Sequence, residues 1–291
     1  MIPESEPKRV SVLERSILAV LFASTVLSFI ALPTAAGDGL LHVWFLDVGQ
    51  GDAIFIQAPN GNQVLIDGGP DNKVLQELGR IMPFSDYSID MLVLTHPHAD
   101  HVNGLIEVLK RYDIDYVFEN NIPYDSAEYR EWNSLKSEAQ VIQTQAGQIM
   151  DFGDGAKLSI LYPYQPGSDK TKITVPHNFM VVMRLEYGGE SLMLTGDMEM
   201  PLEKRLIGGS AFLKANFLKV GHHGSKTSTS EMFLQAVMPR TAFIEVGADN
   251  RFGHPGQVVL DRLESRGIKY YRSDIDGTVE LTLDGRNYQI K

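Results

Sequence analysis

The chain has 291 residues, of which 43% are hydrophobic, so it holds enough apolar material for one large domain or two small ones. Its net charge of −11 argues against tight unaided binding to nucleic acid, because phosphates are bound mainly by Lys and Arg. The chain contains no Cys, which excludes disulfides, thiolate zinc sites and a lipid anchor attached to Cys.

The N-terminus consists of a polar region, residues 1–15, and an uncharged apolar run that starts at residue 16. As a helix, residues 16–36 would span roughly 30 Å, close to the thickness of a bilayer core. Small residues around Ala36 also fit a signal-peptidase site. We therefore expect a transmembrane anchor or a signal peptide, followed by one folded domain over residues 38–291. The domain would be membrane-anchored on the outside of the cytoplasmic membrane, or secreted or periplasmic. The alternative is a buried core helix.

The body alternates between short apolar runs, which predict strands, and amphipathic runs, which predict helices. Strands are expected over residues 40–46, 54–57, 63–66, 89–94, 114–118, 157–161, 179–187, 191–194, 216–220, 241–246, 270–272, 278–283 and 288–291. Helices are expected over residues 71–81, 102–111, 126–136, 200–206, 230–237 and 257–266. Asn60-Gly61 predicts a hairpin turn. The pattern recurs in the second half without a linker, which favours two packed sheets with helices outside.

The stretch from His96 to His101 contains three of the 8 His of the chain and one carboxylate. An apolar run ends just before it, so the cluster should lie where a strand stops, a common position for functional loops. In an extended loop His96 and His98 can face one metal ion, while Asp100 and His101 face a second. The alternative is a surface loop that is rich in His.

Further potential metal ligands follow at the ends of later strands. Asp197 could bridge two cations about 3.5–4 Å apart, although Asp is also a favoured cap for the helix expected from residue 200. His177 fits either a third nitrogen for the first ion or a surface loop. His222 and His223 are adjacent and would point in opposite directions in an extended backbone, so we expect only one to be a ligand. The sequence leaves open which one.

Three aspartates lie beside glycines. Asp67 begins an Asp-Gly-Gly turn and is predicted to support the metal ligands from outside. Asp47 and Asp52 are predicted to be structural, because a tight Gly-rich turn needs side chains that satisfy its backbone donors.

Residues after the paired histidines are candidates for substrate binding. Ser225 and Lys226 would bind a phosphate oxygen or, alternatively, cap the helix expected from residue 230. His254 would be a ligand, donate a proton or hold a phosphate; a purely structural role is the alternative.

The His-x-His-x-Asp-His motif resembles that of the metallo-β-lactamase superfamily, and Asp67, His177, Asp197 and the later histidines fall in the order of that family. The stretches Asp-Val-Gly-Gln-Gly-Asp-Ala53, Thr-Gly-Asp197, Val-Gly-His-His-Gly-Ser225 and Asn-Arg-Phe-Gly-His-Pro255 are similar to the C-terminal domain of ComEC competence proteins and their stand-alone relatives. The resemblance covers about residues 41–291. It implies an α+β fold, a four-layer αββα sandwich with metals at one edge.

The resemblance implies two divalent metal ions, Zn²⁺ or alternatively Mn²⁺, because the ligands offer only nitrogen and oxygen. His96, His98 and His177 would hold one ion, and Asp197 would be shared between the two. Asp100, His101 and one histidine of the pair at 222–223 would hold the other. A water between the ions would lose its proton near neutral pH and become the nucleophile, oriented by Asp100.

The expected function is that of a phosphodiesterase that acts on DNA at the cell envelope, in a competence-like process. The expected partners are single-stranded DNA, the membrane through the N-terminal segment, and a separate channel protein. One alternative is an exported hydrolase of a small ester, such as a phosphocholine ester or a lactam. The other alternative is a non-catalytic envelope module that binds a partner.

Overall fold

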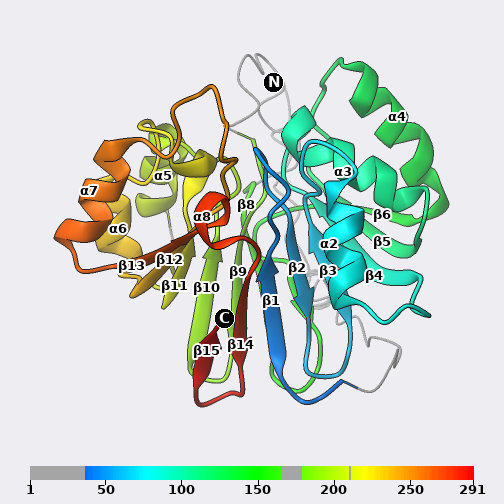
Figure 1. Ribbon diagram of the computed structural model, residues 1–291, viewed down its shortest axis with the longest axis horizontal. Helices are drawn as coiled ribbons and strands as arrows, with labels where there is room; N and C mark the ends of the chain where they lie inside the picture. Colours follow the sequence, from blue (N-terminus) through cyan, green and yellow to red (C-terminus); the bar gives the residue numbers. More distant parts are fainter. Residues whose placement is uncertain (1–36, 165–178, 210) are drawn as a thin grey trace, which may run out of the picture.

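The computed structural model describes residues 37–164, 179–209 and 211–291. In these residues two β-sheets pack face to face, and helices cover both outer sides (Figure 1). The predicted α+β four-layer sandwich is confirmed. The N-terminal segments 1–15 and 16–36 and the predicted ligand His177 lie outside the described residues. Among the helices of the described part, none combines the length and apolar character needed to cross a bilayer.

The first sheet has eight strands in the order β15-β14-β1-β2-β3-β4-β5-β6. They are β1 (Leu41–Phe45), β2 (Ile54–Gln57), β3 (Gln63–Ile66), β4 (Ser88–Leu94), β5 (Asp113–Glu119), β6 (Gln140–Gln143), β14 (Val279–Leu283) and β15 (Tyr288–Ile290). β2 and β3 pair antiparallel around the predicted Asn60-Gly61 turn, whereas β3, β4, β5 and β6 run parallel. The carboxyl ends of β3 and β4 therefore meet at one edge.

The second sheet has seven strands in the order β13-β12-β11-β10-β9-β8-β7. They are β7 (Ile149–Asp151), β8 (Lys157–Tyr162), β9 (Val182–Tyr187), β10 (Glu190–Leu194), β11 (Phe217–Lys219), β12 (Thr241–Ile244) and β13 (Lys269–Arg272). β10 to β13 run parallel, so their carboxyl ends also share an edge. The inner faces of the two sheets form a common apolar core, in which Phe45 and Phe243 stack with ring centroids 4.0 Å apart.

Helices bury their apolar faces against the outer side of each sheet. The helices are α2 (Lys73–Ile81), α3 (Ala99–Leu109), α4 (Ala127–Leu135), α5 (Met200–Ile207), α6 (Glu231–Val237), α7 (Gln257–Ser265) and α8 (Ser273–Asp276), with short 3-10 turns η1 (Lys136–Glu138) and η3 (Gly221–Gly224). α2, α3 and α4 share an apolar cluster with the first sheet, and α5, α6 and α7 share one with the second. Figure 1 shows the two groups of helices on opposite sides of the sheets.

Most predicted elements are found within a few residues of their expected bounds, and three differences matter. The predicted start of the helix over residues 102–111 is wrong, because α3 begins three residues earlier, at Ala99. Asp100 and His101 therefore lie on its first turn. The strands β6 and β7 were not predicted, because both are largely exposed and lack a clear apolar alternation. The helical turn α8 was also missed.

Candidate metal centre

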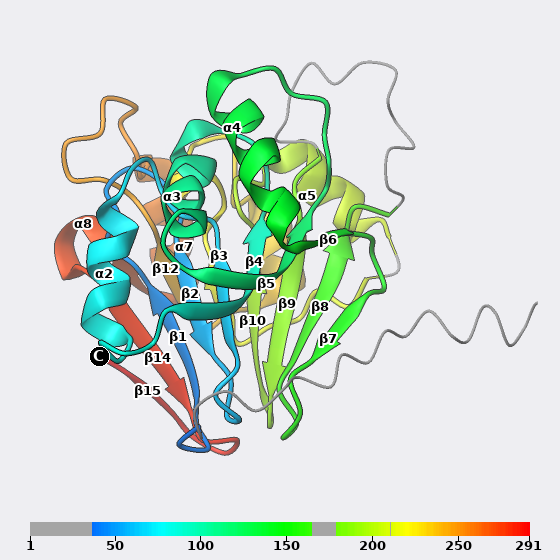
Figure 2. The ribbon, with the colours of Figure 1, turned by 90° about the vertical axis from the view of Figure 1, so that its right-hand side faces the viewer.

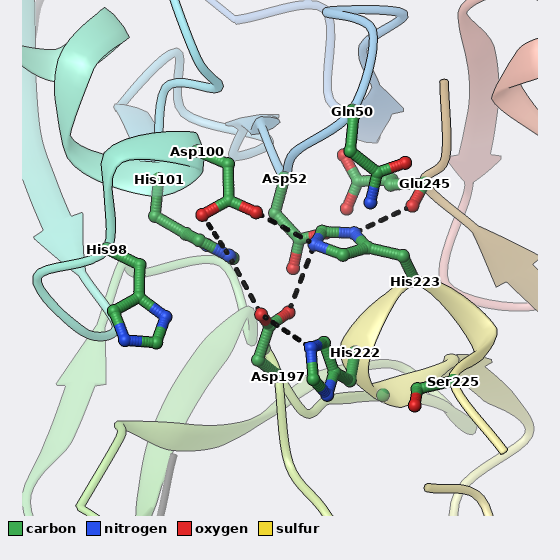
Figure 3. Close-up of polar contacts among 12 residues, drawn as sticks. Gln50, Asp52, His98, Asp100, His101, Asp197, His222, His223, Ser225 and Glu245 are labelled. Carbon is green, nitrogen blue, oxygen red and sulfur yellow. Dashed lines mark hydrogen bonds and ion pairs between the residues drawn. The ribbon is translucent and has the colours of Figure 1, made fainter. Parts of the chain in front are cut away.

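The candidate site lies where strands of both sheets end. β4 leads into Thr95-His96 and β10 leads into Thr195-Gly196-Asp197. Val181 N donates to Thr95 O at 2.9 Å, which joins the two sheet edges beside the site. Figure 3 shows that the rings of His101, His222 and His223 point toward Asp197.

The close packing of a turn against α3 positions His101. Gly68 N donates to His101 O at 2.8 Å, and Gly104 N donates to Gly69 O at 3.0 Å. A Cβ on Gly104 would lie 1.7 Å from Gly68 O, so only glycine allows this approach. Asp67 is thereby held behind His101, and its Oδ2 is 2.8 Å from His101 Nδ1. The other ring nitrogen of His101 faces the site.

Four side chains form the first candidate ligand cluster, which is nearly buried. One ligand atom from each of Asp100, His101, Asp197 and His223 lies within 4.8 Å of all the others. His223 Nε2 is 3.4 Å from Asp100 Oδ2 and 3.4 Å from Asp197 Oδ1. His101 Nε2 is 3.3 Å from Asp197 Oδ2. Asp100 is the most exposed member, with 34% of its side chain accessible.

A second candidate cluster shares Asp197 with the first. It consists of His96, His98 and Asp197, again with one ligand atom each within 4.8 Å. His96 Nε2 is 3.7 Å from Asp197 Oδ2 and 3.0 Å from His98 Nδ1. The alternative role of Asp197 as a helix cap is not found, because Glu199 occupies the cap position of α5 and makes no side-chain cap hydrogen bond.

The paired histidines both approach Asp197, contrary to the expectation for an extended backbone. His222 and His223 have left-handed φ values of 47° and 52° in η3. The tight turn is made possible by Gly221, where a Cβ would lie 2.5 Å from Met198 O. His223 belongs to the first cluster, while His222 Nε2 is 3.8 Å from Asp197 Oδ2.

The chemistry of these side chains fits divalent metal ions. His101 Nε2 and His223 Nε2 are buried without a hydrogen bond, although each faces the shared carboxylate. Unpaired buried polar atoms are rare in folded proteins and indicate an ion or water at that position. The donors are only imidazole nitrogen and carboxylate oxygen, a set that suits Zn²⁺ and also Mn²⁺.

The pKa shifts in the cluster also favour bound divalent metal ions. Burial raises the pKa of Asp197, but the charges of His223 and His101 outweigh it and hold this pKa well below its usual range. Burial raises and the charge of His101 lowers the pKa of Asp100, to about 2. Burial lowers the pKa of His223, but Asp197 and Asp52 raise it to about 10. The site therefore concentrates ionised carboxylates that require positive charge beside them.

A buried polar group behind His223 was not predicted from the sequence. Asp52 Oδ1 is 3.1 Å from His223 Nδ1, and Glu245 O accepts from the same nitrogen at 2.9 Å. The Lys219 ammonium donates to Asp52 Oδ2 and, at 3.2 Å, to Gly196 O. Asp52 was predicted to satisfy backbone donors of its own turn, whereas its carboxylate contacts Lys219 and His223. A lysine within the otherwise apolar run around β11 was the sequence signal for a buried ion pair.

The predicted substrate-binding residues lie around the open side of His222. Ser225 Oγ is 2.9 Å from Thr227 Oγ1, whereas Lys226 is exposed. Neither caps the next helix, since Ser230 Oγ accepts from the backbone N–H of Phe233 at 3.2 Å. His254 lies beside His222, with ring centroids 5.7 Å apart.

Comparison with known proteins agrees with this geometry. The family model of the metallo-β-lactamase superfamily matches residues 46–246. The chain belongs to the metallo-β-lactamase superfamily. This membership, together with the fold, confirms the prediction of a metal-dependent hydrolase.

Two curated relatives extend the match to nearly the whole chain. The chain is 31% identical over 273 residues to ComE operon protein 3 of Bacillus subtilis (strain 168), covering 87% of this chain and 34% of that protein. It is 29% identical over 270 residues to competence protein ComA of Neisseria gonorrhoeae, covering 91% and 35%, respectively. The predicted resemblance to competence proteins is confirmed. The chain spans about a third of the length of these relatives.

Solved structures share the fold at low sequence identity. CmlA, a diiron β-hydroxylase from Streptomyces venezuelae, aligns with a TM-score of 0.55 and 14% identity, covering 94% of this chain and 60% of that one. Zn²⁺-bound PqqB from Methylobacterium extorquens aligns with a TM-score of 0.54 and 14% identity, covering 84% and 99%. At this identity the comparison bears on the fold alone.

Proposed function

We propose that the chain is a two-metal phosphodiesterase that cleaves DNA at the cell envelope in a competence-like process. The observation that carries the proposal is the pair of ligand clusters that share Asp197. His96 and His98 would hold one ion, with His177 as the predicted third nitrogen, and Asp100, His101 and His223 the other. The relatives named for competence support DNA as the substrate, because competence is the uptake of DNA.

When bound, the two ions would lower the pKa of a water and neutralise charge on the phosphate oxygens under attack. The side chains of the protein supply the orientation. Asp67 fixes the ring of His101, and the Glu245 carbonyl with Asp52 fixes that of His223. Such contacts behind the ligands set which ring nitrogen faces the site.

Asp100 is the member of the cluster that can act on the attacking water. Its side chain is partly accessible, and its pKa of about 2 keeps it ionised at neutral pH. An ionised carboxylate at this position accepts a hydrogen bond from water and directs a lone pair of the water oxygen toward the substrate.

Three side chains at the open side of the site would receive the substrate. Ser225 and Lys226 follow the histidine pair directly in the chain, Ser225 buried and Lys226 exposed, and would bind phosphate oxygens. Burial and the charges of His222 and His223 lower the pKa of His254, so its ring is neutral at neutral pH. A neutral imidazole can both donate and accept a hydrogen bond.

The test measures metal content and hydrolysis by the purified full chain supplied with Zn²⁺ or Mn²⁺. The substrates are single-stranded DNA, duplex DNA and bis-p-nitrophenyl phosphate. Asp197→Asn should lose metal and activity, whereas Asp113→Asn should retain both. Asp113 is exposed at the amino end of β5, and the site lies at the carboxyl ends of the strands. Full activity in Asp197→Asn would contradict the two-metal proposal.

The same assay separates the competing functions. Hydrolysis of the small phosphodiester without cleavage of DNA favours an exported hydrolase of a small ester. Metal binding without hydrolysis of any phosphodiester or ester favours a non-catalytic envelope module. We further propose that the protein is located at the envelope, with residues 16–36 as an anchor or as an export signal. A separate channel protein would deliver the DNA strand. Membrane fractionation with sequencing of the N-terminal peptide distinguishes an anchor from a cleaved signal peptide.

A further inference from the structure

A row of aromatic rings leads from the surface to the candidate metal centre. Phe252 is 58% exposed in the connection between β12 and α7, which Figure 2 shows in orange projecting from the upper edge of the sandwich. Its ring stacks on His254, with centroids 5.9 Å apart and an interplanar angle of 20°. His254 in turn lies edge-on to His222, whose Nε2 is 3.8 Å from Asp197. The exposed ring is thus connected to the site by contiguous side chains.

A second aromatic ring approaches the site from the other sheet. Tyr124 lies in the connection between β5 and α4, and its ring centroid is 5.8 Å from that of His98. Tyr129 packs edge-on against Tyr124, with centroids 6.2 Å apart, and is itself buried. Tyr124 contacts His98 of the second candidate cluster, and Phe252 is linked to Asp197 through His254 and His222, so one aromatic ring comes from each half of the sandwich.

Positive charge accompanies these rings, although the chain as a whole is acidic. Arg251 lies over the ring of Phe252, 5.5 Å from its centroid, and Lys226 is exposed in the neighbouring loop. The two loops are in contact, because Gly256 N donates to Gly224 O at 2.8 Å. Within the described residues, neither Arg251 nor Lys226 forms an ion pair with a carboxylate, so both can receive phosphates. Asp249 is the exposed acidic side chain in the same loop, in which Glu245 is buried.

We propose that Tyr124 and Phe252 are base-stacking platforms that hold single-stranded DNA across the two metal clusters. One base stacks on each ring, and on Phe252 it takes the place of the Arg251 guanidinium that lies over this ring. The displaced guanidinium and Lys226 then hold the phosphates on the Phe252 side. Stacking on an aromatic ring tolerates any sequence, because every base has a π-face. It requires an unpaired base, since the bases of a duplex stack on one another. The proposal deepens the proposed phosphodiesterase function and rests on it.

The experiment compares two end-labelled oligonucleotides of equal length, one of thymidylate and one in which every base is removed. The full-chain protein cleaves both with the same metals, and KM and kcat are measured for each. Phe252→Ala should raise KM about tenfold for the oligothymidylate and leave KM for the abasic strand unchanged, because the loss is that of one stacked base. Tyr124→Ala should raise the KM for oligothymidylate to a similar extent. The double variant Tyr124→Ala with Phe252→Ala should remove most of the difference in KM between oligothymidylate and the abasic strand.

Three variants control for the ring and for the fold. Phe252→Tyr and Tyr124→Phe keep an aromatic face and should retain the KM for oligothymidylate. Phe84→Ala removes a ring that is 94% exposed in the loop before β4, at the opposite end of the strand from His96, and should change nothing. Unchanged thermal unfolding and metal content of Phe252→Ala exclude a folding defect.

The outcomes separate this proposal from the proposed function. If no strand is cleaved by the metal-loaded protein, the phosphodiesterase function itself is wrong. If both strands are cleaved with equal KM, or if Phe252→Ala weakens both equally, the stacking proposal alone is wrong. Cleavage of oligouridylate with the same KM and kcat as oligothymidylate overturns the assignment to DNA.

Discussion

Lys219 and Asp52 form an ion pair that is almost completely inaccessible to solvent, directly behind the candidate metal centre. They are 167 residues apart in the sequence. Lys219 lies in β11 of the second sheet, whereas Asp52 lies in the connection between β1 and β2 of the first sheet. The second oxygen of Asp52 reaches His223, and the ammonium of Lys219 also binds the carbonyl next to Asp197. The ion pair thus connects the contact behind His223 with the backbone beside Asp197.

Lys219→Met should strongly destabilise the protein, because it leaves the buried carboxylate of Asp52 without its cation. The expected loss is about 3–5 kcal/mol in the free energy of unfolding, measured with urea. The double variant Lys219→Met with Asp52→Asn removes both charges and should recover much of this loss. Equal stability of Lys219→Met and the unsubstituted protein would show that Asp52 is protonated when buried.

Most of the candidate site follows from short motifs, for a simple reason. Parallel strands bring their carboxyl ends together, so polar residues placed at those ends must meet. The residues gathered after β4 in the first sheet, and those after β10 and β11 in the second, are therefore predictable within each sheet. That the two groups meet at Asp197 was predicted from the family resemblance. The pairing of Lys219 with Asp52 is not predictable in this way, because it depends on how the two sheets face each other.

The orientation of His222 and His223 also depends on tertiary packing, which local sequence patterns do not predict. Two adjacent residues with left-handed backbone are unfavourable unless glycines beside them allow close contacts. Gly221 packs against Met198 O, and a Cβ on Gly224 would lie 2.6 Å from Pro255 Cβ. Glycines on both sides of His222 and His223 were the available sign that this segment is not extended.

Asp67→Asn should weaken metal binding while leaving the ligands in place. Asp67 accepts from His101 Nδ1 at 2.8 Å and from Thr95 Oγ1 at 2.6 Å, so it determines the orientation and basicity of His101. The expected loss in metal affinity is about 10–100-fold, as for other residues directly behind metal ligands. Competition with a chromogenic chelator measures the affinity, and Asp113→Asn is the matched control. An unchanged affinity would argue against His101 as a ligand.

Gly104→Ala should disrupt the contact that holds Asp67 beneath His101. The added Cβ would lie 1.7 Å from Gly68 O, so α3 must shift, at a cost of about 1–3 kcal/mol in unfolding free energy. Gly79→Ala in α2 is the matched control, because its Cβ meets nothing within 4 Å and alanine favours the helix by roughly 0.5–1 kcal/mol. Urea unfolding measures both changes, and metal content should fall only in Gly104→Ala.

Removal of metal with a chelator should make stability depend on pH in a defined direction. Burial lowers the pKa of His223, but Asp197 and Asp52 raise it from 6.5 to about 10. Burial and the charge of Asp52 raise the pKa of Glu245 from 4.5 to about 8. A group whose pKa is higher in the folded state stabilises it fully below the unfolded pKa and loses this effect as the pH rises through the folded pKa.

The metal-free protein should therefore lose the contribution of Glu245 between pH 4.5 and about 8 and that of His223 between pH 6.5 and about 10, as the two groups give up their protons. Urea unfolding at several pH values measures the slope. His223→Gln removes one titrating group and should flatten the upper part of this slope. Metal ions bound in place of the proton would supply the positive charge that the carboxylates require, so the metal-loaded protein should show a weaker decline. A metal-free protein that gains stability across this range would contradict the assigned charges.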